Sequence, residues 1–275
     1  MPALAICAMV LPAIGQPLLA DSDMEELRQR APAGDNDTNT IRQWLAAEFA
    51  AIDAAHPDDF RKKIQKLRTD PATNPAFRSE FDTRLAEFAA DQLGKDNPEH
   101  AAIALIRTLI DLNDPLTIPG LEAGLSSAHP TVRYLAARGL ADLGPRIASD
   151  PNKLAPFILA LQQAGVAETN GVIVERIYRA LDLKPLPPQA VTAFEQILSA
   201  RIAQYRERRT RLLDQAEITA VQILTEAGLD QARSAGIVRA LAPLLRLDVQ
   251  QLTSMLDNPK LPQPIGARDL LERRL

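Results

Sequence analysis

Residues 114–144 decide the fold of this chain, and they read DPLTIPGLEAGLSSAHPTVRYLAARGLADLG. Leucine, isoleucine and valine recur every three or four residues in both halves of the stretch, which is the spacing of one buried face of an α-helix. Asp114-Pro115 and His129-Pro130 precede the two apolar stripes, and proline suits the first turn of a helix because no N–H bond is needed there. The stretch therefore predicts two consecutive helices packed as an antiparallel pair.

The same punctuation recurs along the chain. Asp-Pro or Asn-Pro pairs occur at 70–71, 74–75, 97–98, 114–115 and 150–151, and each combines a side-chain oxygen that can cap a helix with a proline that can open one. A further start is predicted at Thr40, because Thr40 and Gln43 fit a capping box. The predicted helices span 40–54, 57–68, 74–93, 98–112, 115–127, 130–143, 151–164, 170–183, 188–204, 205–227, 230–241 and 248–256. No stretch of strict apolar–polar alternation indicates a strand, so the predicted fold is all-α, an α-solenoid of antiparallel helix pairs.

The helix pair in residues 114–144 resembles a HEAT repeat. The residues that carry the resemblance are Asp114-Pro115, Pro119 and the pattern Pro130-x-Val132-Arg133-x-x-Ala136-Ala137-x-x-Leu140. In that family an arginine follows the valine and commonly meets an aspartate in the turn between the helices. Arg133 matches this arginine, whereas Ser127 occupies the aspartate position. The resemblance extends more weakly over 74–183, and it implies an armadillo-type stack of repeats that binds other proteins.

The pattern divides the chain into four parts. Residues 1–20 are predicted to be a signal peptide and residues 21–38 a flexible polar leader. Residues 39–186 are predicted to form the HEAT-like helical repeats. Residues 187–275 are predicted to form a helical C-terminal cap or a small bundle, because a solenoid must cover its open apolar end.

The first twenty residues, MPALAICAMVLPAIGQPLLA, carry no charged side chain. Their apolar run is too short to span a bilayer and has the length of the central region of a secretory signal. We expect cleavage after Gly15 or Ala20 and a protein exported to the periplasm or beyond. The alternative is a buried N-terminal helix, which the prolines in this segment disfavour. Lipidation of Cys7 requires a true start further upstream.

Composition excludes several classes of protein. With 46% hydrophobic residues and a formal net charge of -4, the chain is neither disordered nor a nucleic-acid binder held by phosphate contacts. Its one cysteine excludes a disulfide framework and a multi-thiolate zinc site. His56, His100 and His129 have no His or Cys partner one helical turn away, so the sequence predicts no metal site and no cofactor.

No short catalytic motif is found, whether a glycine-flanked serine, a phosphate loop, a dinucleotide fingerprint or an HExxH pair. We therefore expect a non-enzymatic scaffold for protein–protein interaction. Arg133, Tyr134 and Arg138 are the first partner-binding candidates, although Arg133 fits a structural role better, with its guanidinium packed against the neighbouring turn.

Residues 201–211 carry a cluster of arginines that supplies further candidates, namely Arg206, Arg208 and Arg209. A solvated helix face is the favoured interpretation of this cluster. An alternative is a lipid-associated helper that uses these arginines on an anionic membrane surface. Another alternative is an envelope-associated enzyme or enzyme-assembly factor whose acidic site leaves no short motif.

Overall fold

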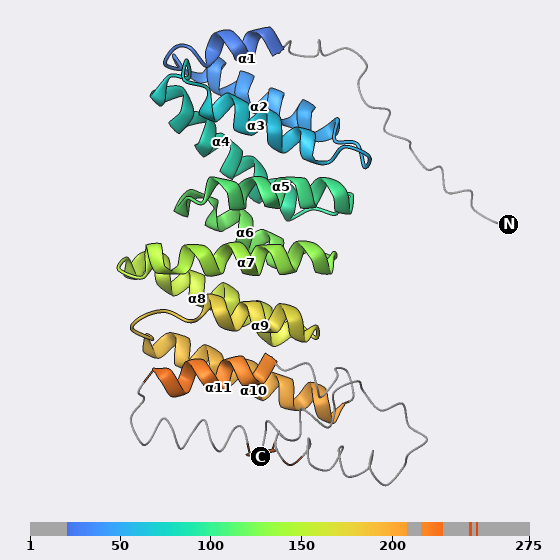
Figure 1. Ribbon diagram of the computed structural model, residues 1–275, viewed down its shortest axis with the longest axis vertical. Helices are drawn as coiled ribbons and strands as arrows, with labels where there is room; N and C mark the ends of the chain where they lie inside the picture. Colours follow the sequence, from blue (N-terminus) through green and yellow to red (C-terminus); the bar gives the residue numbers. More distant parts are fainter. Residues whose placement is uncertain (1–20, 208–215, 228–241, 244–245, 247–275) are drawn as a thin grey trace, which may run out of the picture.

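The computed structural model describes residues 21–207, 216–227, 242–243 and 246 of the 275-residue chain (Figure 1). Within these residues the secondary structure is helical and no strand occurs. The elements are α1 (Asp21–Leu27), α2 (Asp35–Ala50), α3 (Asp58–Thr69), α4 (Pro75–Leu93), α5 (Glu99–Leu112), the 3-10 turn η1 (Pro115–Thr117), α6 (Ile118–Leu125), α7 (Pro130–Ile147), α8 (Pro151–Ala167), α9 (Gly171–Ala180), α10 (Pro188–Arg206) and α11 (Ala216–Glu226). The all-α prediction is confirmed.

The helices stack in two layers. One layer holds α2, α4, α6, α8 and α10 in order, and the other holds α3, α5, α7, α9 and α11 (Figure 1). From α2 onward each helix packs against the helix two positions further along the chain, and most helices from α4 onward also pack against a neighbour in sequence. Packing of this kind, in which each pair meets only the adjacent pairs, is the α-solenoid arrangement that the sequence predicts.

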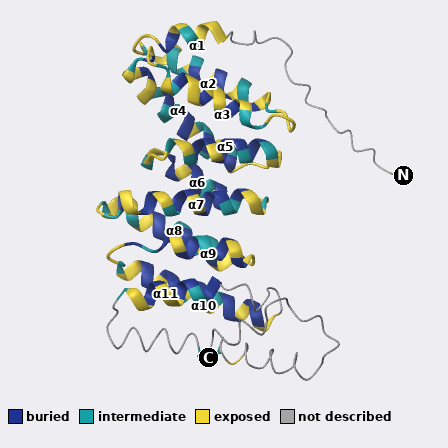
Figure 2. Ribbon diagram, in the orientation of Figure 1, coloured by how far each residue is buried: buried dark blue, intermediate teal, exposed yellow. Residues whose placement is uncertain are grey.

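The buried side chains form one continuous apolar cluster between the two layers, from Met24 in α1 to Leu224 in α11 (Figure 2). Small residues set the spacing of the helices in its middle. A Cβ atom on Gly124 of α6 would lie 2.6 Å from the Cδ1 atom of Ile106, and one on Gly139 of α7 would lie 3.0 Å from Ile110. The glycines therefore let α6 and α7 approach α5 closely.

The proline-marked helix starts are confirmed at four of the five pairs, and the side-chain cap is confirmed at three of these. The side chains of Asn74, Asp114 and Asp150 each accept a backbone N–H bond from the residue two positions further on, and a helix or 3-10 turn follows. The prediction is wrong at Asp70, which ends α3 and accepts the N–H of Ala72 in a turn. At Asn97 the side-chain amide instead donates to the carbonyl oxygen of Gln92, so it satisfies the end of α4 rather than the start of α5.

The N-terminal segment differs from the flexible leader predicted for residues 21–38. It contains α1, whose Met24 and Leu27 are buried, and it contains the start of α2, which begins at Asp35 rather than at Thr40. Arg28 anchors the segment because it pairs with Glu25 and with Asp70 at the end of α3. The segment was predicted to be flexible because most of its residues are polar. Its two buried apolar residues, Met24 and Leu27, lie three positions apart and pack on the adjoining end of the core.

The C-terminal helices also depart from the prediction. α10 continues to Arg206, so the predicted break between residues 204 and 205 is wrong, and α11 begins at Ala216. Tyr205 is buried inside α10 rather than at the start of a long helix. Three predictions fall wholly outside the described residues: the signal at residues 1–20 and the helices at 230–241 and 248–256. In the described part of the chain, no helix is long and apolar enough to cross a membrane.

Candidate functional site

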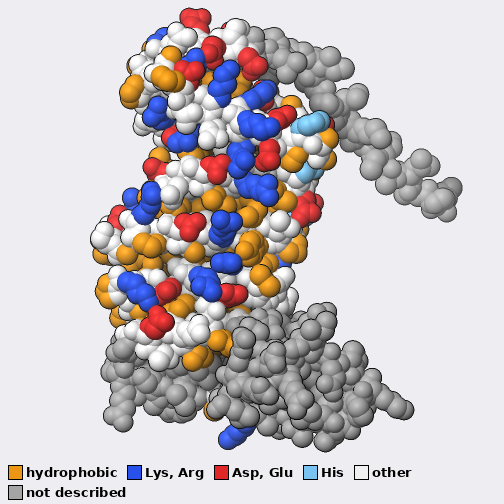
Figure 3. All heavy atoms as spheres, in the orientation of Figure 1, with side chains coloured by type: hydrophobic (Ala, Val, Ile, Leu, Met, Phe, Trp, Pro, Cys, Tyr) orange, Lys and Arg blue, Asp and Glu red, His pale blue; other side chains and the backbone are white. Residues whose placement is uncertain are grey.

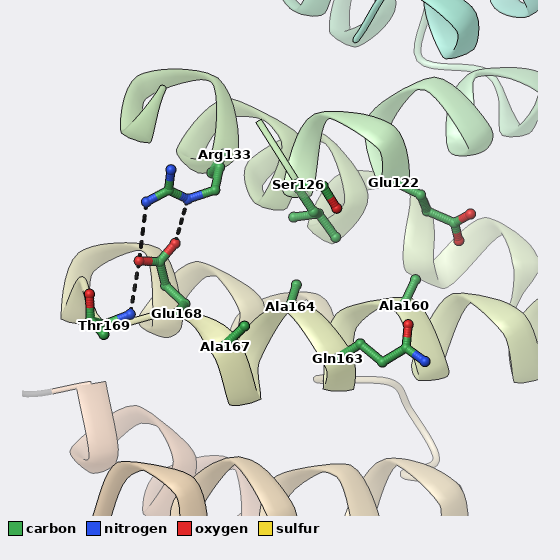
Figure 4. Close-up of a pocket in the computed structure, with 10 residues that line it drawn as sticks. Glu122, Ser126, Arg133, Ala160, Gln163, Ala164, Ala167, Glu168 and Thr169 are labelled. Carbon is green, nitrogen blue, oxygen red and sulfur yellow. Dashed lines mark hydrogen bonds and ion pairs between the residues drawn. The ribbon is translucent and has the colours of Figure 1, made fainter. Parts of the chain in front are cut away.

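A groove runs between α6 and α8 in the even-numbered layer (Figure 4). Its volume is about 490 Å³, and small side chains line much of it. Ala160, Ala164 and Ala167 face it from α8, and Leu125 and Ser126 close it from α6. Alanine leaves space where a larger side chain would fill the gap between neighbouring helices, so these residues leave a groove between α6 and α8.

An ion pair between α7 and the turn after α8 closes one end of the groove. The Nε atom of Arg133 on α7 donates to one carboxylate oxygen of Glu168 at 2.7 Å, and a terminal nitrogen of Arg133 donates to the other at 3.3 Å (Figure 4). The same guanidinium donates to the carbonyl oxygens of Ser127 and Ala128 in the turn before α7. These contacts match the structural role expected for Arg133, in which its guanidinium packs against the neighbouring turn. Ser127 occupies the position where an aspartate was expected to meet Arg133. The carboxylate that binds Arg133 is instead that of Glu168, in the turn between α8 and α9.

Glu168 is held in the charged form by these contacts. Its side chain is 5% exposed, and burial by itself opposes ionisation. Hydrogen bonds from Arg133 and from the backbone N–H groups of Asn170 and Thr169 outweigh that burial and lower the pKa of the Glu168 carboxyl. The Glu168 carboxylate, which accepts hydrogen bonds from Arg133 and from two backbone N–H groups, therefore links α7 to the turn between α8 and α9.

Side chains of α10 bind the same turn from its other side. Arg201 of α10 donates to the carbonyl oxygen of Thr169 at 3.3 Å, and Gln204 donates to that of Glu168 at 3.1 Å. Arg201 also donates to Glu217 of α11 and to the hydroxyl of Tyr205, each at 2.8 Å. The turn between α8 and α9 is therefore fixed by polar side chains from both adjacent repeats.

Arg201 corrects the interpretation of residues 201–211 as a solvated basic face. Its side chain is fully buried, because α11 and the turn after α8 enclose it. Arg206 is exposed at the end of α10. Arg208 and Arg209 lie outside the described residues.

A carboxylate with no partner among the described residues lies toward the other end of the groove. Glu122 of α6 is half-buried, and burial raises the pKa of its carboxyl. Among the described residues, no cation or hydrogen-bond donor pairs with it. The other charged groups that line the groove, Arg133 and Glu168, bind each other. Glu122 is therefore a partly desolvated charge whose cost is not offset within the described structure.

Replacing Glu122 by glutamine is expected to stabilise the protein, by less than about 1 kcal/mol at neutral pH. The raised pKa means that folding disfavours the ionised carboxylate, so the penalty is full above the folded pKa and disappears below the unfolded value. Urea denaturation at pH 7 should show the gain, and the gain should vanish near pH 3.5. Asp96→Asn, at an exposed acid in the turn after α4, is the control and should change little.

The surface of α8 extends the groove with exposed apolar side chains. Leu159 is 50% exposed and Val166 is 38% exposed. They flank Gln163 at a spacing of three to four residues, so all three lie on one side of α8. Side chains of this size cost free energy in water, and a stripe of them beside a groove is typical of a surface that another chain covers.

The odd-numbered layer carries Tyr134 and Arg138, the other two candidates from α7. The guanidinium carbon of Arg176 on α9 lies 5.4 Å from the centre of the Tyr134 ring, so this tyrosine contributes to the contact between repeats. Arg138 is exposed. The structure therefore separates the three predicted neighbours: Arg133 ends the groove, Tyr134 packs on α9 and Arg138 faces solvent.

Opposite charges are interleaved on this second face (Figure 3). Arg61 of α3 lies 3.4 Å from Asp111 of α5, and Arg107 of α5 lies 3.7 Å from Asp58 of α3. Charged side chains on this face thus form ion pairs between α3 and α5. Exposed pairs of this type contribute little stability each.

Two of the three histidines connect successive turns of the stack. The Nε2 atom of His129 lies 3.0 Å from the carbonyl oxygen of Asn97, and that of His100 lies 3.3 Å from the carbonyl oxygen of Ile52. His56 is exposed beside Asp53. Among the described residues, no three His, Cys, Asp or Glu side chains are grouped in a way that could hold a metal ion.

Sequence reasoning missed Glu122, Glu168 and Arg201. Glu122 had a visible signal, since it is the one charged residue in the apolar helix IPGLEAGL. Glu168 lies in the long turn after α8, where the sequence gives no indication of which residue points inward. Arg201 was hidden by the arginines that follow it, because a cluster of like charges suggests solvent exposure for all its members.

No protein-family model, no curated protein and no solved structure matches this chain.

Proposed function

We propose that this protein is a non-enzymatic scaffold that binds a segment of another protein in the groove between α6 and α8. The observation that carries the proposal is the groove itself, about 490 Å³ in volume. The exposed Leu159 and Val166 lie on the same side of α8 as Gln163, which lines the groove. A protein segment supplies both things that this surface lacks, namely apolar atoms to fill the space over the alanines and a cover for the exposed side chains.

The stacked architecture supports the same proposal. In an α-solenoid each repeat exposes the outer surface of both its helices, so the stack offers a long surface for its size. The turn between α8 and α9 is held by Arg133 and Arg201 from opposite sides. A preformed groove loses little conformational entropy when a partner binds, which favours affinity.

The proposal includes HEAT-like repeats and export from the cytoplasm. The pattern around Arg133 supports the first, and the uncharged apolar composition of residues 1–20 supports the second. N-terminal sequencing of the protein isolated from its host is expected to begin after Gly15 or Ala20. An intact Met1 would contradict export by signal cleavage.

Photo-crosslinking tests the groove directly. A photoreactive phenylalanine analogue at Gln163 is expected to give a discrete crosslinked adduct in the native host, because this side chain lines the groove. Adding Ala164→Arg to the same chain should abolish the adduct, since a long charged side chain would occupy the groove floor.

The matched control places the photoreactive residue at Arg138, which is exposed on the opposite layer. Its adducts should be unaffected by Ala164→Arg. Thermal melting should show that Ala164→Arg is folded, because Ala164 is only half-buried and packs at the edge of the core beside the groove. An adduct at Gln163 that persists with the groove filled would contradict the proposed function.

A further inference from the structure

We propose that the groove selects a basic side chain, so that the partner segment carries a lysine or arginine that pairs with Glu122. This inference rests on the proposed function and specifies the chemistry of the partner. It differs from the general expectation for a scaffold because it assigns a role in recognition to one carboxylate.

The charges that line the groove favour a cationic guest. They are Glu122, Arg133 and Glu168. Arg133 and Glu168 neutralise each other at 2.7 Å, and Glu168 also accepts two backbone N–H bonds. Glu122 is left as the net negative charge of the groove. An acidic or phosphorylated segment would meet this charge with no free cation among the described lining residues to offset it.

The burial of Glu122 strengthens the argument. Water is already partly excluded from its carboxylate, and burial is the cause of its raised pKa. A cation placed next to a half-desolvated carboxylate interacts more strongly than it would with a fully hydrated one. While the carboxylate is ionised, a positive partner offsets the free energy that its desolvation costs.

The shape of the groove fits the stem of the same side chain. Lysine and arginine bury their methylene groups on apolar surface and keep the charged end at a polar group. Ala160 and Ala164 provide that surface between the Arg133 end and the Glu122 end (Figure 4). Leu159 and Val166 then provide contacts for apolar residues on either side of the basic one.

Selection from a library of random 12-residue peptides displayed on phage tests the inference without a known partner. The full protein serves as bait, and peptides that also bind the Ala164→Arg protein are removed. The recovered peptides are expected to share a lysine or arginine flanked by apolar residues. Bait with Glu122→Lys should recover peptides with aspartate or glutamate at the same position, and bait with Asp96→Lys should reproduce the original selection.

Affinity measurements then isolate the charge. Changing the shared basic residue to glutamine should weaken binding to the original protein roughly tenfold, and the same change should have little effect on the Glu122→Gln protein. Because Glu122→Gln preserves side-chain shape, this comparison stands even if Glu122→Lys fails to fold.

The outcomes separate the two proposals. Groove-dependent peptides without a shared basic residue would overturn the inference and leave the proposed function in place. A shared basic residue whose contribution is unchanged by Glu122→Gln would overturn it as well. Failure to recover any groove-dependent peptide would contradict the groove as a binding site for protein segments, and with it both proposals.

Discussion

Replacing Arg201 by methionine is expected to destabilise the protein by about 3–5 kcal/mol. The guanidinium is fully buried and binds Glu217, Tyr205 and the carbonyl oxygen of Thr169. Methionine fills a similar volume but leaves the buried carboxylate of Glu217 without its charge partner. Chemical denaturation monitored by circular dichroism measures the loss.

A double substitution separates the ion pair from the packing. Arg201→Met combined with Glu217→Leu removes both charges, so it should recover a large part of the stability that Arg201→Met loses. Arg206→Met, five residues further along α10, is the matched control because Arg206 is exposed. It should change stability by less than about 0.5 kcal/mol. A loss below about 1 kcal/mol for Arg201→Met would show that the buried network contributes little.

Replacing Glu168 by alanine is expected to cost about 2–4 kcal/mol at pH 7. The substitution removes the acceptor of Arg133 and of two backbone N–H groups at the start of α9. Because Arg133 links Glu168 to the preceding repeat, the loss should also loosen α8 relative to α7. Urea denaturation at pH 7 gives the magnitude.

The pH dependence distinguishes a charged contact from simple packing. The pKa of Glu168 is lowered in the folded protein, so its ionisation stabilises the fold above the unfolded value, and that contribution declines as the pH falls through the folded pKa. The deficit of Glu168→Ala should therefore shrink in acid. Glu175→Gln is the control, since Glu175 pairs with Arg179 within one helix near the surface, and its effect should stay below about 0.5 kcal/mol. A deficit that is constant from pH 7 to pH 2 would contradict the role of the charge.

These two substitutions act on the same turn, which positions the groove. Residues 168–170 connect α8 to α9, and their polar contacts reach α7 on one side and α10 on the other. Loss of either arginine contact is expected to move α8, whose alanines line the groove. Binding of groove-selected peptides should consequently weaken in Arg201→Met, although Arg201 does not line the groove.

The sequence predicted the helical stack because its signals are local. The apolar period, the capping residues and the prolines each act within a few positions of the chain, so most helices of residues 58–206 could be placed in advance. The leader was predicted wrongly for a related reason. Met24 and Leu27 are few among polar neighbours, and only the core beside them shows that they are buried.

The candidate site could be predicted only in part. The pattern around Arg133 identified this residue, and its packing against the neighbouring turn was expected. Its carboxylate partner, Glu168, lies 35 positions away, in the turn between α8 and α9. The sequence named Tyr134 and Arg138 with it as partner-binding candidates. Successive helical residues point in different directions, and the structure assigns these three side chains to different surroundings.

The sequence by itself thus determined an all-α chain of short helices whose apolar faces require stacking. Tertiary structure decided which charges are paired. Arg201 belongs to a run of arginines and Glu122 is the one charged residue of an apolar helix, but neither signal shows how far the side chain is buried. Arg201 is fully buried with its partners, and Glu122 lies in a groove without one among the described residues. The physical reason is that desolvation depends on the helices packed around a side chain, and those helices come from distant parts of the chain.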